Sequence, residues 1–142
     1  MRHLLPLITI VLLCASCCLL RSRKSEFSNT RWTSSYEMFL TDVGTEKTTV
    51  TLTFGPSNTF VLEQQTVMPP YPSMYANADG TVDKNPGYTR TSTRNGTYQV
   101  KDKTIILTET SGSVHNLLIS PDHLTAPDLT FQELVFTRAE KQ

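Results

Sequence analysis

Apolar and polar residues alternate along most of the chain after residue 27. In TTVTLTF, residues 48–54, Val50, Leu52 and Phe54 share one face and threonines occupy the other. A period of two is typical of a half-buried antiparallel strand. The turn GPSN follows, and TFVLEQQTV then returns with the same alternation. Similar patterns predict strands over 30–40, 48–54, 59–67, 96–100, 104–109, 114–120, 124–126 and 129–138.

These short segments predict an all-β domain. Turn signals separate strands every 8–12 residues, which is typical of a β-barrel or a β-sandwich. Residues 27–140 include 21 threonines, and this β-branched residue favours a pleated surface. No apolar stripe with a helical period of ten residues or more interrupts the pattern. The aromatic residues expected in the core are Trp32, Phe54, Phe60, Tyr98 and Phe131.

The segment 67–88 does not follow this alternation. It contains four of the eight prolines of the chain and carries Met68, Tyr71, Met74 and Tyr75. A connection of this length in a compact domain is uncommon and is often functional. We therefore expect either an apolar lid over the mouth of a barrel or a mobile surface loop.

The N-terminus has the layout of a secretory signal. A short basic start precedes an apolar run, Leu4–Leu13, and the small residues Ala15 and Ser16 follow. The four residues Cys14-Ala15-Ser16-Cys17 resemble the lipobox of bacterial lipoproteins, although that family usually has Leu in the first position. The resemblance implies cleavage after residue 16 and lipidation of Cys17, with Cys18 as the alternative site.

Two other interpretations of this N-terminus stay open. The segment could be an ordinary signal peptide, or a signal anchor, since 17 apolar-looking residues are near the lower limit for spanning a bilayer. In the lipoprotein interpretation, 1–16 is the signal peptide, 17–26 is the lipidated cysteine with a basic tether, and 27–142 is the barrel domain. Several acyl chains would give stable anchoring, at about 0.8 kcal/mol per buried methylene.

Charge constrains the location and the partners. Arg21, Arg23 and Lys24 make the tether basic, which favours attraction to an anionic leaflet. Residues 27–140 carry 8 Lys and Arg against 12 Asp and Glu, so we expect no nucleic-acid partner. We expect a protein of the bacterial cell envelope. The periplasmic side is favoured over the cell surface, because no acidic run follows the anchor.

Residues that could carry catalysis are sparse, and we expect no enzyme activity, no cofactor and no metal site. His115 and His123 lie on different elements without zinc-ligand spacing, and we expect both at the surface. The stretch NADGTVDKN contains Asn77, Asp79 and Asp83 near a glycine, but it lacks the glutamate of a calcium loop and predicts a β-turn. No nucleophile elbow, phosphate loop or carboxylate pair is present.

A series of motifs runs through 30–138. It comprises an early Trp, LTF, then G-x-Y-x-V with I-x-L, then L-x-x-P-x-x-L and a final L-x-F-x-R. This order resembles that of the small lipocalin-like lipoproteins of Bacteroidetes. Lipocalins carry Gly-x-Trp in the first strand, where this chain has Thr30-Arg31-Trp32. The resemblance implies an antiparallel up-and-down barrel of about eight strands, with a lumen for a small apolar ligand.

The sequence thus predicts a membrane-anchored, non-catalytic barrel that binds a small, partly apolar ligand, with no ligand-binding residue identified. The alternative is a protein-binding or inhibitor module. Its barrel core would be filled, and it would use the loop 67–88 to contact an unknown protein partner.

Overall fold

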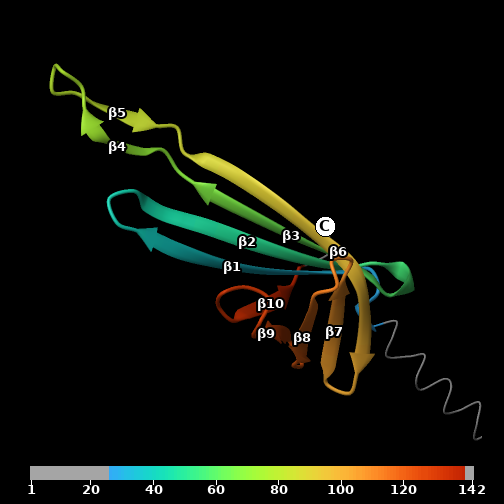
Figure 1. Cartoon of the computed structure of the whole chain (residues 1–142). Helices are drawn as coiled ribbons and strands as arrows, with labels where there is room; N and C mark the ends of the chain where they lie inside the picture. Colours follow the sequence, from blue (N-terminus) through green and yellow to red (C-terminus); the bar gives the residue numbers. More distant parts are fainter. Residues whose placement is uncertain (1–25, 140–142) are drawn as a thin grey trace, which may run out of the picture.

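The computed structural model describes residues 26–139, which form an antiparallel β-barrel (Figure 1). Eight strands close the barrel in the order β1-β2-β3-β6-β7-β8-β9-β10, and β10 returns to β1. This confirms the all-β, up-and-down, eight-stranded prediction. The strands are β1 (Thr30–Leu40), β2 (Gly44–Phe54), β3 (Thr59–Met68), β4 (Tyr71–Ala76), β5 (Val82–Asn85), β6 (Tyr88–Lys101), β7 (Thr104–Glu109), β8 (Val114–Ile119), β9 (His123–Ala126) and β10 (Leu134–Arg138).

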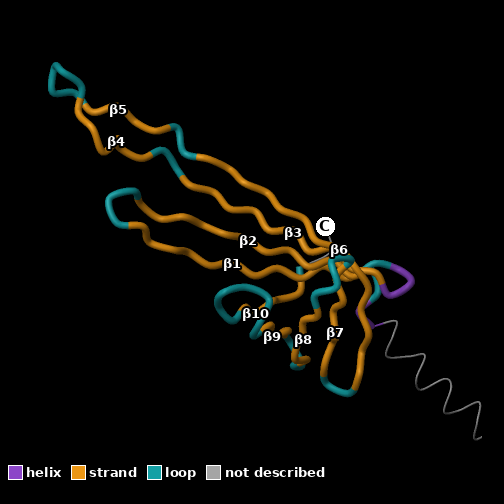
Figure 2. The backbone as a smooth tube through the Cα atoms, in the orientation of Figure 1, coloured by secondary structure: helices purple, strands orange, loops and turns teal. Residues whose placement is uncertain are grey.

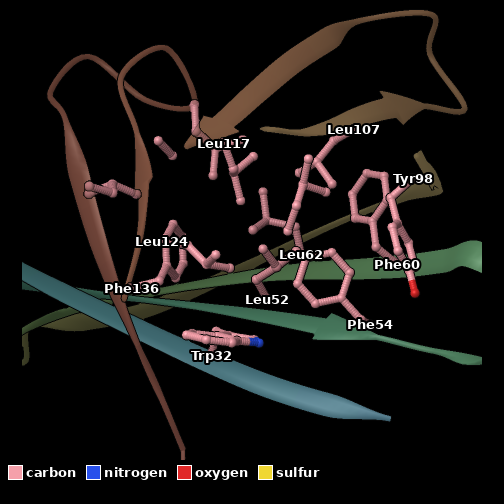
Figure 3. Close-up of a cluster of buried hydrophobic side chains, with 14 of the residues drawn as sticks. Trp32, Leu52, Phe54, Phe60, Leu62, Tyr98, Leu107, Leu117, Leu124 and Phe136 are labelled. Carbon is pink, nitrogen blue, oxygen red and sulfur yellow. The ribbon is translucent and has the colours of Figure 1, made fainter. Parts of the chain in front are cut away.

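Alternating side chains place the core inside the barrel. In β2, Val50, Leu52 and Phe54 are buried, while the threonines between them point outward. Figure 3 shows aromatic and aliphatic side chains from opposite sides of the barrel converging on one cluster. Phe54 packs edge-on against Tyr98, with ring centroids 4.7 Å apart. The largest fully buried side chains are Tyr98, Phe54, Phe60, Phe136, Leu52, Leu62, Ile105, Leu107, Leu117, Leu124, Leu134 and Val50.

Four of the five aromatic residues expected in the core are buried, and Phe131 is not. Its side chain is 69% exposed, because β10 begins only at Leu134 rather than at residue 129. The segment 127–133 is instead a loop between β9 and β10. Phe131 lies on this loop and packs edge-on against Tyr36, with ring centroids 5.4 Å apart.

The barrel closes at Trp32 without the glycine of the lipocalin pattern. Trp32 pairs with Arg138 of β10 and is buried. The Thr30 hydroxyl donates to the Phe27 carbonyl at 2.5 Å and accepts from Trp32 Nε1 at 3.0 Å. The Phe27 ring lies 6.2 Å from the Trp32 ring and 5.7 Å from that of Phe54. Thr30 thus holds Phe27 and Trp32 together at the end of the barrel where β1 begins.

The strands differ in length, so only part of the barrel is closed. β1, β2, β3 and β6 have 10 to 14 residues, whereas β7 to β10 have 4 to 6. β10 pairs with β1 only at Trp32 and Thr33, and β7 pairs with β6 only from Gly96 onward. Beyond these points the four long strands continue as an open sheet, which Figure 2 shows extending past the short strands.

Most of the segment 67–88 forms a β-hairpin that points away from the barrel, so the prediction of an apolar lid over the barrel mouth is wrong. The alternative, a mobile surface loop, stays a prediction. β4 and β5 pair with each other and project beyond the end of β3 and β6, away from the barrel (Figure 1). The β3–β6 ladder stops at Met68 and Tyr88. Three of the four residues that link this ladder to the hairpin are prolines, which have no N–H to donate. The tip, residues 77–81, is the turn that the sequence predicted.

Residues 1–25 lie outside the described part of the chain. The predicted signal peptide, Cys17 and nearly all of the basic tether therefore have no structural description here and stay predictions. Within residues 26–139, no helix combines the length and the apolar character needed to cross a bilayer.

Candidate functional site

A groove lies at the rim of the closed part of the barrel, where the open sheet begins. Its volume is about 360 Å³. One wall is the inner face of the long strands, and the opposite wall is the β9–β10 loop. The residues that line it are Tyr36, Glu46, Thr48, Gln64, Thr66, Arg90, Ser92, Leu129, Thr130 and Phe131.

The sheet wall is polar because the inward-facing positions change character along the strands. Leu52 faces Leu62 across the β2–β3 ladder within the core. Two residues further from the core the pair is Val50 and Gln64, and two residues beyond that it is Thr48 and Thr66. The hydroxyls of the two threonines lie 3.0 Å apart and hydrogen bond to each other. Polar groups thus replace the apolar core at the level of the groove, and these two hydroxyls satisfy each other there.

Charged groups lie at the open end of the groove. The Tyr88 hydroxyl donates to Glu46 Oε2, and this bond raises the pKa of the phenol because it favours the protonated donor. The Arg90 guanidinium lies 5.4 Å from the centre of the Tyr88 ring. This distance is typical of a cation–π contact. Within residues 26–139, no carboxylate forms an ion pair with Arg90. The groove therefore presents a positive charge beside a carboxylate that is already hydrogen bonded.

A cluster of charged residues holds the β9–β10 loop, which forms the wall opposite the sheet. Glu109 Oε1 accepts from Arg94 Nη1 at 2.8 Å, and Glu109 Oε2 accepts from the Ser111 hydroxyl at 2.9 Å. Arg94 also donates to the Leu129 carbonyl of the β9–β10 loop at 3.4 Å. This cluster ties β6 and β7 to the loop that carries the aromatic wall of the groove.

The environment of Glu109 holds its carboxylate in the charged form. Its side chain is only 8% exposed. Burial alone would raise its pKa, because it disfavours the charged form. The hydrogen bond from Ser111 and the charges of Arg94 and His115 outweigh burial, so the pKa of Glu109 lies below its ordinary value.

His115 belongs to this cluster, so the prediction that it is a surface histidine is wrong. Its side chain is 14% exposed, and Nε2 lies 3.1 Å from Glu109 Oε1. Its Nδ1 lies 3.9 Å from Asp128 Oδ1. No spacing in the sequence indicated this contact, because Glu109 and His115 come together only through the pairing of β7 with β8.

The other candidates for chemistry lie apart from the groove. His123 begins β9, and its Nδ1 lies 2.7 Å from the neighbouring Asp122 carboxylate. Asp79 caps the β4–β5 turn by accepting from the N–H and the hydroxyl of Thr81. No group of three or more His, Cys, Asp or Glu side chains suited to a metal ion occurs in the described residues.

The barrel interior below the groove is filled by its own side chains, as Figure 3 shows for the region around Leu62. The deep lumen that the lipocalin resemblance implied is therefore replaced by packed core, and the groove lies above this core at the rim. A second hollow of about 300 Å³ lies at the other end, beside Phe27, Val100 and Ile119. It borders on Glu26, where the described chain begins, whereas all residues of the rim groove lie well inside the described chain.

Comparisons with known proteins point to a structural similarity. No family model matches the chain, and no curated protein matches it. Among solved structures, the chain is similar to the Cpx pathway activator NlpE from Escherichia coli, with 14% sequence identity and a TM-score of 0.39. The similarity covers 78% of this chain and 46% of NlpE, so the chain spans less than half the length of that structure. The barrel assignment rests on the strand pairing of the chain itself.

We predict that Glu109 makes folding sensitive to acid. A carboxyl with a lowered pKa in the folded state stabilises the fold above its unfolded pKa of about 4.3. That contribution is lost as the pH falls through the lower, folded value. The free energy of unfolding, measured by urea titration between pH 3 and pH 7, should therefore fall less steeply toward acid in Glu109→Gln than in the wild type. Glu63→Gln, on the exposed face of β3, is the matched control. Equal slopes for Glu109→Gln and the wild type would contradict this role.

Proposed function

We propose that this chain is a lipid-anchored protein of the bacterial cell envelope whose barrel binds a small, partly apolar ligand without catalysis. The observation that carries the binding proposal is the rim groove, which places a polar wall opposite an aromatic one. The anchor rests on the sequence, through the resemblance of the residues around Cys17 to a lipobox.

The size of the groove supports a small ligand. The groove has a volume of about 360 Å³. Binding sites for small molecules commonly have volumes of several hundred cubic ångströms, so this groove falls at the low end of the range. It matches a compact molecule or one end of a longer molecule.

The two walls support a ligand with an apolar part and a polar part. Leu129 and the paired rings of Tyr36 and Phe131 offer apolar surface. Gln64 and the hydroxyl side chains beside it offer amide and hydroxyl groups, and Arg90 adds a positive charge. An apolar body would pack against the loop and Tyr36 of β1, and a neutral polar or anionic end would face the polar positions of β2, β3 and β6.

The arrangement of titratable groups supports binding rather than catalysis. The lining hydroxyls have no histidine within the groove to activate them, and His115 bonds to Glu109 beneath it. The carboxylate in the groove, Glu46, accepts a hydrogen bond from the Tyr88 hydroxyl. The group bonded to Glu46 is therefore a phenol, which is a weak acid rather than a base.

The anchor and the groove fit together in one arrangement. The described chain begins at the end of the barrel opposite the β4–β5 hairpin (Figure 1). An anchor at Cys17 would be joined to that end through the short segment 18–26. The open sheet and the groove would then face away from the membrane, toward the soluble contents of the compartment.

A protein-binding module using segment 67–88 is the second candidate. The observation that favours it is the exposure of Met74 and Tyr75, which are 77% and 81% exposed on the projecting hairpin. The hairpin does not contribute to the groove, so the two functions can be tested separately.

We predict that the chain purified from its native host carries a small molecule in the rim groove. Denaturation, solvent extraction and mass spectrometry should reveal one recurring compound in the wild type. The amount recovered should fall about ten-fold in Tyr36→Ala, because losing the ring removes part of the apolar wall. A ten-fold loss of affinity corresponds to about 1.4 kcal/mol of binding free energy. Lys47→Ala, on the outer face of β2, is the control and should retain the compound.

Adding the compound back should raise the melting temperature of the wild type as its occupancy increases. The ligand proposal fails if no compound is found and a panel of lipids and haem produces no thermal shift. It also fails if Tyr36→Ala retains the compound at the wild-type level.

We predict that Cys17 is the lipidated residue. Labelled palmitate supplied to the host should be incorporated into the wild type and absent from Cys17→Ala. Label that persists in Cys17→Ala and disappears in Cys18→Ala would move the site by one residue. Full-length, unlabelled protein in the wild type would show that the N-terminus is a signal anchor instead.

A further inference from the structure

One edge of the open sheet has no neighbouring strand. β6 pairs with β3 from Tyr88 to Thr97, but on its other side β7 pairs with it only from Gly96 onward. The half of β6 from Tyr88 to Arg94 therefore has a strand on one side only. The edge is long enough for an added strand, since seven residues exceed the usual strand length of about five or six.

The backbone groups on this free edge can be assigned from one hydrogen bond. The Asn95 carbonyl accepts from the Thr110 N–H, which shows that the backbone of residue 95 points toward the β7 side. Backbone groups alternate in direction along a strand, so those of Thr89, Thr91 and Thr93 point the same way. These residues lie beyond the last pair of the β6–β7 ladder, so their N–H and C=O groups face outward without a strand to bond.

The edge lacks most of the features that usually block strand addition. Natural proteins protect free edges with prolines, charged side chains (lysine above all), bulges or a covering loop. Arg90 and Arg94 are the charged residues of this edge. Residues 88–94 contain no proline and no lysine, and their pairing with β3 runs without a register shift. Every side chain from Tyr88 to Thr93 is exposed. The edge is thus accessible and regular.

The charge of the edge indicates what would bind there. Residues 84–101 contain four Lys and Arg and no Asp or Glu, although residues 27–140 as a whole are net acidic. Arg94 is paired with Glu109, whereas Arg90 lies over the Tyr88 ring and forms no ion pair among the described residues. The nearby Glu46 carboxylate accepts from the Tyr88 hydroxyl instead. A strand added at this edge would place alternate side chains on the same face as Arg90, next to its guanidinium.

The other free edge of the sheet is less suited to the same partner. β10 leaves β1 after Thr33, so Ser34–Leu40 is also unpaired on one side. That edge carries Glu37 and no cationic residue. An acidic segment would meet a like charge there, whereas it would meet Arg90 on β6.

We propose that the free edge of β6, Tyr88–Arg94, binds an extended acidic segment of a partner protein as an added strand. The backbone groups of Thr89, Thr91 and Thr93 supply the hydrogen bonds, and Arg90 selects for carboxylates. The backbone hydrogen bonds of the added strand do not depend on a ligand in the groove, because the free backbone groups point along the sheet rather than into the groove. Arg90 is shared, since its side chain also lines the groove.

The test uses the full chain and a defined peptide. The probe is fluorescein-labelled Glu-Val-Glu-Val-Glu-Val-Glu, whose alternation places carboxylates on one face in any register. Its binding, measured by fluorescence anisotropy, should be at least about ten-fold tighter than that of the same peptide with Lys for Glu. Thr91→Pro removes one outward N–H and should weaken binding at least about ten-fold, since proline cannot donate at that position.

Two matched controls separate this site from the others. Ser35→Pro places the same substitution on the free edge of β1. The Arg31 carbonyl accepts from the Ala139 N–H on that side, so the backbone of every second residue from Arg31, including Ser35, points outward. Tyr36→Ala alters the groove and leaves the β6 edge unchanged. Both variants should bind the peptide within about two-fold of the wild type. A loss in Tyr36→Ala that equals the loss in Thr91→Pro would place the peptide in the groove and overturn the proposal.

A charge reversal covers the case in which Thr91→Pro does not fold, as judged by circular dichroism. Arg90→Glu should then exchange the preference, so that the Lys peptide binds more tightly than the Glu peptide. The proposal is overturned if the wild type binds neither peptide or both equally. It is also overturned if the chain forms dimers through this edge, which sedimentation would show as concentration-dependent mass that Thr91→Pro abolishes.

Discussion

The difference in length between the two sets of strands determines most of this structure. Four long strands supply one continuous curved sheet, and four short strands close it over only part of its length. Where the short strands are present, side chains from both sides meet and exclude water, and burial of that apolar surface stabilises the fold. Where they are absent, the same inward-facing positions have no partner across the barrel and must be compatible with solvent.

The change from apolar to polar positions follows this boundary. Leu52 and Leu62 lie within the closed part, and Thr48 and Thr66 lie at its rim. Phe131 and the loop around it face the polar positions and complete the groove. The cluster around Glu109 holds that loop to β6 and β7, so the fixed position of the groove wall depends on a partly buried charge network. Glu109 is its buried member, and removing a partner of a buried charge lowers the free energy of unfolding because that charge is left uncompensated.

The regular part of the fold could be predicted from the sequence because it depends on local alternation. The strands around Phe54, Phe60 and Tyr98 follow a period of two, and all three residues are buried as expected. The prediction for Phe131 is wrong because LTFQELVFTR is not one alternating strand. Its apolar positions change phase between Phe131 and Leu134, and β10 begins only at Leu134.

The features that depend on strand register or on residues far apart in the sequence could not be predicted in the same way. His115 and Glu109 meet through the β7–β8 register, and no sequence spacing marks their contact. The hairpin within 67–88 could not be recognised from the sequence because its prolines interrupt the alternation of apolar and polar residues. In the structure those prolines interrupt the ladder briefly, and pairing resumes at Tyr71 and Asn85. The groove residues come from four strands and one loop, so only the closed barrel brings them together.

The measurement that tests this account most directly is amide hydrogen exchange of the native chain, resolved by residue with NMR. The account predicts slow exchange for the paired amides of β2, β3 and β7 around Leu52, Leu62 and Leu107, which lie in the closed and filled part of the barrel. It predicts fast exchange for Thr89, Thr91 and Thr93, whose N–H groups face an empty edge. Equal protection of these two groups of amides would contradict the division into a closed half and an open half.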